Sequence, residues 1–138
     1  MVKNFGQLSS GETAHLYSLM TDMLRICVTD FGGTLVSVEV KDKSGKFVDI
    51  TLGYDDVAGY ENDNDCFGFN IGRNANRISN AQFTLNNIKY VLAKNDGENN
   101  LHSGPHLFSK RMWHVTEYRD DSIIFEIESL HLDQGFPG

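Results

Sequence analysis

The sequence predicts an all-β protein, an antiparallel β-sandwich built as a single domain over residues 1–138. Three observations predict this class. Short runs of apolar and β-branched residues recur along the chain, turn-forming residues separate these runs, and no long amphipathic helical pattern is present. Strands that are joined by short turns favour an antiparallel sandwich or barrel.

The first half of the chain contains four runs that we expect to be strands, at residues 15–20, 23–28, 34–40 and 47–52. Thr21 and Asp22 form a plausible hairpin turn between the first two runs. The paired glycines Gly32 and Gly33 break the chain before the third, because glycine adopts backbone angles that other residues avoid. Residues 54–60 are expected to form a short helical turn.

The second half contains two expected hairpins. Residues 81–85 and 88–92 are separated by Asn86-Asn87, and asparagine tolerates the left-handed angles of a two-residue hairpin loop. Residues 94–100 form a loop by composition. Residues 112–118 and 122–129 form the final hairpin, in which apolar residues alternate with mostly polar ones. This alternation predicts one buried and one solvated face.

Charge excludes some partners. The net charge is −7, from 12 basic and 19 acidic residues. A nucleic-acid partner or an anionic membrane surface would favour a basic face, so neither is expected. No apolar run is long enough to span a membrane, and the first residues lack a signal-peptide pattern. We therefore expect a cytoplasmic protein whose two cysteines are reduced thiols.

The final residues, 132–138, have the composition of a loop after the last hairpin. A strand without a partner exposes backbone donors and acceptors that invite pairing with another chain. The expectation is that this chain is the truncated, N-terminal part of a larger domain. A second copy, as a homodimer, or a complementing C-terminal chain would cover its edges.

Residues 72–78 (Gly-Arg-Asn-Ala-Asn-Arg-Ile) concentrate hydrogen-bond donors that suit the hydroxyl and ring oxygens of a sugar. In a regular strand, Asn76 and Arg77 would point to opposite faces. Both could serve one pocket only at a bulge or a strand end. In the alternative reading the arginines merely hold a loop by pairing with carboxylates at Asp55, Asp56, Asp63 or Asp65.

Residues 99–105 place His102 in a loop between asparagines and Ser-Gly-Pro. Histidine can orient a hydroxyl group or move a proton near neutral pH. The alternative is an exposed loop histidine without a role. His102 and His106 have the spacing of metal ligands on a helix, but Gly104-Pro105 between them argues against a helix. No metal site and no cofactor are expected.

Taken in order, these segments resemble those of galactose mutarotases, the aldose 1-epimerases. Residues 72–78 resemble the GRxANRI motif of that family, and residues 100–104 resemble NxLHGG, with Ser103 where the motif usually has glycine. Weaker similarities lie at residues 31–35, 49–54, 83–92, 108–113 and 135–138.

The resemblance implies a large β-sandwich, often called a supersandwich, that interconverts the α and β anomers of a free aldose such as galactose or glucose. A glutamate base and a histidine acid would open the sugar ring without a cofactor. Asn76 and Arg77 match residues that contact sugar hydroxyls, and His102 matches an auxiliary histidine that orients the sugar. The segments that carry the principal acid and base have no counterpart in residues 1–138, so the isolated chain is expected to be nearly inactive.

Three other functions remain open from the sequence. A hexose-phosphate epimerase would require additional basic residues around the pocket, which the net charge of −7 does not favour. A non-catalytic carbohydrate-binding or assembly module would bind sugar without converting it. In a plain structural β-domain, Arg77 and His102 would be incidental.

Overall fold

The computed structural model describes residues 1–138, which form two compact units. Unit 1 comprises Met1–Asn70 and Met112–Ile127, and unit 2 comprises Ile71–Arg111 and Glu128–Gly138. The paired strands of both units are antiparallel and the only α-helix is short, which confirms the expected all-β class. The single domain expected over residues 1–138 stays a prediction. No helix of the chain is long and apolar enough to cross a membrane.

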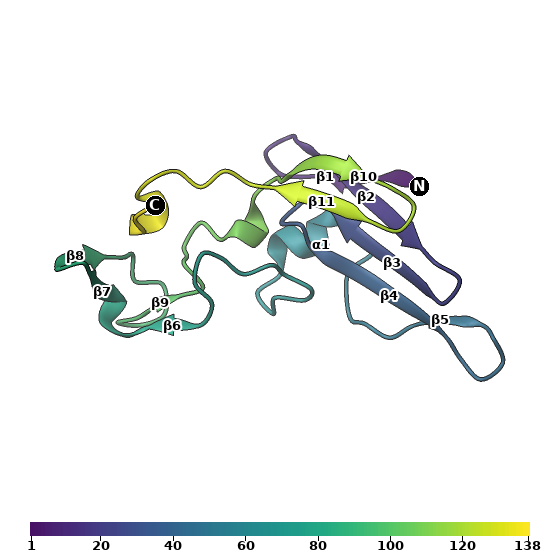
Figure 1. Cartoon of the computed structure of the whole chain (residues 1–138), viewed down its shortest axis with the longest axis horizontal. Helices are drawn as coiled ribbons and strands as arrows, with labels where there is room; N and C mark the ends of the chain where they lie inside the picture. Colours follow the sequence, from purple (N-terminus) through teal and green to yellow (C-terminus); the bar gives the residue numbers. More distant parts are fainter. The chain divides into compact units, whose positions relative to one another are not determined.

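Unit 1 contains a five-stranded antiparallel sheet in the order β1-β2-β3-β4-β5 (Figure 1). The four strands expected in this half of the chain are confirmed as β2, β3, β4 and β5. The bounds of the five strands are Val2–Gln7 for β1, Thr13–Met20 for β2, Leu24–Thr29 for β3, Leu35–Lys41 for β4 and Phe47–Asp49 for β5.

Two features of this sheet differ from expectation. Strand β1 was not predicted, because only Phe5 in it is buried and a bulge between Asn4 and Gly6 interrupts its register. Strand β5 ends at Asp49 rather than continuing to residue 52. The carboxylate of Asp49 accepts hydrogen bonds from Thr51 N at 3.0 Å and from Val38 N at 3.2 Å, so the side chain takes over part of the ladder.

Helix α1 (Val57–Asn62) closes the core of unit 1. The Asp56 side chain caps it by accepting a hydrogen bond from Gly59 N at 3.1 Å. The helix therefore begins later than the expected range of 54–60. Its buried residues, Val57 and Tyr60, belong to the main apolar cluster of the unit. The other buried members of that cluster are Phe5, Leu8, Ala14, Phe31 and Val36.

The hairpin of β10 (His114–Tyr118) and β11 (Ile123–Glu126) also belongs to unit 1, and it confirms the prediction for residues 112–129. The Tyr118 hydroxyl donates a hydrogen bond to Ser18 O at 2.8 Å, which ties the hairpin to β2. Tyr17 makes edge-to-face contacts with Tyr118 and Phe125 at ring-centroid distances of 5.3 and 6.0 Å.

Unit 2 is built from two short antiparallel pairs. Strand β6 (Arg77–Ile78) pairs with β9 (Asn100–Leu101), and β7 (Gln82–Leu85) pairs with β8 (Ile88–Val91). Asn86 and Asn87 have φ angles of 52° and 63°, so the predicted two-residue hairpin loop is confirmed. A small core forms where Ala81, Leu92 and Phe136 are buried together.

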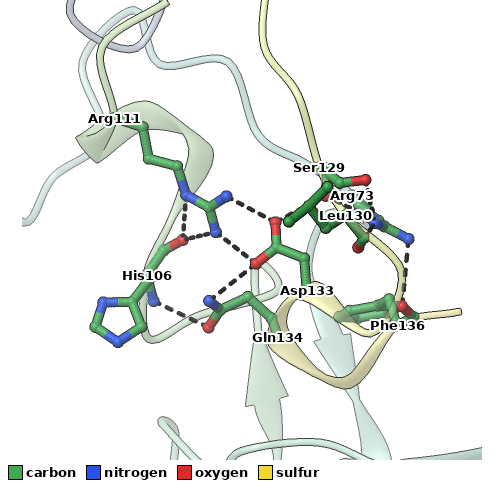
Figure 2. A network of polar contacts seen from close by, with 8 residues as sticks. All are labelled: Arg73, His106, Arg111, Ser129, Leu130, Asp133, Gln134 and Phe136. Carbon is green, nitrogen blue, oxygen red and sulfur yellow. Dashed lines mark hydrogen bonds and ion pairs between the residues drawn. The ribbon is translucent and has the colours of Figure 1, made fainter. Parts of the chain in front are cut away.

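Arg73 holds the C-terminal segment of unit 2 (Figure 2). Its guanidinium donates to the hydroxyl and carbonyl oxygens of Ser129, at 2.8 and 2.9 Å, and to Leu130 O at 2.7 Å. It also donates to Pro137 O at 2.9 Å and to Phe136 O at 3.4 Å. One side chain therefore satisfies acceptors at both ends of the segment.

A second arginine anchors the same segment. Arg111 contacts the two carboxylate oxygens of Asp133 at 2.6 and 3.0 Å, and it also donates to His106 O at 2.7 Å (Figure 2). The hydrogen bonds from Arg111, together with one from the Ser129 hydroxyl, hold the pKa of Asp133 well below its usual range. Asp133 is therefore charged at neutral pH, and the Ser129 hydroxyl, which donates to it and accepts from Arg73, links the contacts of the two arginines.

Candidate functional site

The Gly-Arg-Asn-Ala-Asn-Arg-Ile segment is not a regular strand. Only Arg77 and Ile78 lie in β6, and Asn76 immediately before them has a left-handed φ of 63°. The Arg77 Nη1 group lies 3.4 Å from Asn76 Oδ1, so the two side chains lie side by side. This is the strand-end arrangement that sequence reasoning required if both residues are to serve one site.

His102 lies opposite Asn76, where the pairing of β6 with β9 ends. Arg77 pairs with Leu101 in the ladder. Beyond this pair, His102 N donates to Asn76 O at 3.0 Å, and Asn76 N donates to the ring atom His102 Nδ1 at 3.0 Å. The fold of unit 2 thus brings together the three residues that the sequence singled out.

The ionic partner of Arg77 is Asp96. Arg77 Nε donates to Asp96 Oδ2 at 2.6 Å, and the two side chains are 56% and 32% exposed. A guanidinium has five N–H donors, of which two are used here by Asp96 and Asn76. Because the other donors stay available, the ion pair orients Arg77 without consuming its capacity to bind hydroxyl oxygens.

The structure separates the two arginines of the motif. Arg73 is turned into the network with Ser129 and the C-terminal carbonyl groups, whereas Arg77 lies exposed at the strand end. In the alternative interpretation, both arginines hold a loop by pairing with carboxylates at Asp55, Asp56, Asp63 or Asp65. Arg73 does hold a loop, but through hydroxyl and carbonyl oxygens, and Arg77 pairs with a different carboxylate, that of Asp96.

Two asparagines that sequence reasoning did not select hold the His102 loop. Asn100 is fully buried, and its Nδ2 donates to Ala93 O at 2.8 Å and to Gly104 O at 3.0 Å. Asn95 bonds both backbone groups of Leu101, at 2.7 and 2.9 Å. A Cβ atom at Gly104 would lie 2.2 Å from Asn95 Nδ2, so a larger residue here would displace the Asn95 side chain from its bonds to Leu101. The abundance of asparagine in residues 94–100 was the available signal.

His102 and His106 do not form a metal site with other residues. His106 lies in the Arg111 network, where its backbone N–H group donates to Gln134 Oε1 at 3.2 Å (Figure 2). No group of three or more histidine, cysteine, aspartate or glutamate side chains in residues 1–138 is arranged to hold a metal ion. The site consists of hydrogen-bond donors and one carboxylate, which suits a neutral polyhydroxyl ligand.

Comparison with known proteins identifies the family. The family model for aldose 1-epimerase matches residues 15–138. The galactose mutarotase of Bos taurus is 37% identical over 135 residues, a stretch covering 97% of this chain and 39% of the relative. The aldose 1-epimerase of Escherichia coli is 34% identical over 113 residues, which is 82% of this chain and 33% of the relative.

Solved structures agree with this assignment. An aldose epimerase homologue from C. elegans superimposes with a TM-score of 0.85 at 31% identity, covering 91% of this chain and 39% of that structure. The galactose 1-epimerase from Lactobacillus acidophilus shares the fold, with a TM-score of 0.83 at 20% identity, over 100% of this chain and 41% of its own. The chain belongs to the aldose 1-epimerase family, and it spans about two fifths of the length of the relatives it matches.

Proposed function

We propose that this chain is the sugar-contacting part of an aldose 1-epimerase, in which Asn76, Arg77 and His102 bind a free hexose. The observation that carries the proposal is the meeting of these three residues at the open end of the β6–β9 pair. Their donors can bind several hydroxyl or ring oxygens at once, and Asp96 keeps Arg77 oriented.

The reaction proposed for the whole protein is interconversion of the α and β anomers by acid–base ring opening. A base removes the proton of the C1 hydroxyl group, an acid protonates the ring oxygen, and closure after rotation about the C1–C2 bond gives the other anomer. The principal acid and base are proposed to come from residues beyond 1–138. Because a positioned acid or base contributes about 10²- to 10⁴-fold each, the chain alone should have little activity.

Polarimetry of freshly dissolved α-galactose tests this division. We expect no acceleration above buffer with the chain alone. Addition of the C-terminal remainder of the bovine galactose mutarotase, as a separate chain, should restore turnover, and Arg77→Met should abolish it. Turnover by the chain alone that His102→Ala abolishes would contradict the division of the site.

The alternative function, a carbohydrate-binding module, has a different outcome in the same experiment. Such a module would bind galactose, but no complementing chain would make it accelerate anomerisation. A matched control is Arg119→Met, which removes an exposed arginine of unit 1 that pairs with Glu117. The control should leave turnover unchanged.

A further inference from the structure

Ser103 has a backbone conformation that disfavours serine. Its φ is 59°, in the left-handed region, and the residue is only 2% exposed. A non-glycine residue in this region costs on the order of 1 kcal/mol, whereas glycine adopts it freely. The motif that this segment resembles usually has glycine at this position. The serine side chain should therefore make interactions that offset the strain.

The Ser103 hydroxyl bonds both backbone groups of one residue in the opposite loop. It accepts a hydrogen bond from Asn74 N at 2.7 Å and donates one to Asn74 O at 3.0 Å. Because the hydroxyl is buried, loss of either bond would leave a polar group without its partner. Glycine at this position could make neither bond, so the serine adds a link between the two loops.

The neighbouring contact fixes the protonation pattern of His102. A backbone N–H group can only donate, and Asn76 N donates to His102 Nδ1 at 3.0 Å. Nδ1 must therefore act as an acceptor, and the neutral ring carries its hydrogen on Nε2. The bond from His102 N to Asn76 O, also 3.0 Å, keeps the two residues in this register.

We propose that Ser103 is a positioning residue. By fixing the backbone of Asn74, its hydroxyl keeps the Asn76 N–H group bonded to His102 Nδ1 and so keeps His102 in the Nε2–H tautomer. In that state, Nε2 donates a hydrogen bond and has no lone pair with which to take a proton. His102 therefore presents a donor to a sugar oxygen and does not serve as the base. The contact between His102 and a sugar oxygen rests on the proposed sugar site, whereas the assignment of the tautomer does not.

The test is a long-range ¹H–¹⁵N NMR spectrum of the histidine rings, recorded on the whole chain without sugar. Comparison with His102→Gln identifies the His102 signals. The wild type should show an unprotonated Nδ1 and a protonated Nε2. In Ser103→Gly, which relieves the backbone strain and so should fold, both nitrogen shifts should move toward the average of the two tautomers. Ser103→Ala should do the same, which shows that the hydroxyl group is responsible.

Ser109→Ala is the matched control, because Ser109 is also buried in unit 2 but its hydroxyl has no hydrogen-bond partner. It should leave the His102 signals unchanged. A wild-type spectrum with a protonated Nδ1 would overturn the tautomer assignment. Unchanged signals in both Ser103 variants would overturn the role of Ser103. Repeating the wild-type spectrum with methyl β-galactoside tests the sugar site separately, since a failure to bind would leave the tautomer result standing.

Discussion

Replacement of Arg73 by methionine should release the C-terminal segment of unit 2. Methionine keeps the apolar stem of the side chain and removes all of its donors. The guanidinium bonds the hydroxyl of Ser129 and four backbone carbonyl groups in residues 129–137. All of these acceptors lie on the segment that the side chain anchors, so the substitution removes a single, well-defined attachment.

The magnitude follows from these contacts. Hydrogen bonds to a charged group contribute roughly 1.5–3 kcal/mol each. Here the segment is partly exposed, so water replaces several of the lost donors. The net loss should be about 2–3 kcal/mol in the free energy of opening the segment. That loss corresponds to amide exchange that is roughly 30- to 140-fold faster.

Hydrogen exchange followed by NMR measures this directly at the amides of Asp133, Gly135 and Phe136, which donate to carbonyl groups within the segment. Arg119→Met is the control, because Arg119 is exposed and belongs to unit 1. Exchange at these three amides that stays within about twofold of the wild type would refute the assigned role of Arg73.

Three further predictions concern other parts of the molecule. Asp96→Asn should weaken galactose binding about 2- to 5-fold in an NMR titration, because the lost ion pair orients Arg77 and is worth roughly 0.5–1 kcal/mol. Gly68→Ala should lower the free energy of unfolding, measured in urea, by roughly 2–4 kcal/mol, because Gly68 has a φ of +65° and a Cβ atom there would lie 1.9 Å from a carbonyl oxygen. Gly45 has a φ of +82° but open space around it, so Gly45→Ala should cost only about 1 kcal/mol. The pKa of Asp133 is lowered, so its contribution to the stability of the C-terminal segment is complete above the ordinary aspartate pKa of about 3.9 and is lost as the pH falls through the lower folded-state value. Amide exchange in the segment, corrected for intrinsic rates, should therefore stay constant from pH 7 to about pH 4 and become faster only in stronger acid.

The elements with a clear local pattern could be predicted from the sequence. The run at residues 34–40 alternates, and it forms β4. Asn86-Asn87 between two apolar runs forms the hairpin loop, because asparagine tolerates a positive φ at both positions. In each case the physical cause lies within a few adjacent residues. Local residue types were therefore sufficient to identify the structure.

Elements that depend on distant contacts could not be predicted in this way. Strands β6 and β9 have two residues each, too few to show a period, and they exist because the two loops pair. The sequence alone gives Arg73 and Arg77 the same chemistry. Only the fold turns Arg73 into the C-terminal segment and leaves Arg77 beside Asn76.

The candidate site was predictable in its members but not in its geometry. Asn76, Arg77 and His102 were selected for their donors and for the family motifs they match. The bond from Asn76 N to the His102 ring depends on two residues with positive φ, which residue type alone does not predict. The supporting role of the buried Asn100 was also missed, because its partners are backbone carbonyl groups, which the residue types do not reveal.

The most direct test of the proposed site is a ¹H–¹⁵N correlation spectrum of the chain titrated with galactose. We expect saturable shifts at the amides of Asn76, Arg77 and His102, and much smaller shifts in the Arg77→Met variant. The Arg119→Met variant should behave as the wild type. Shifts confined to other residues, or shifts that Arg77→Met leaves unchanged, would contradict the assignment of the sugar site to the end of the β6–β9 pair.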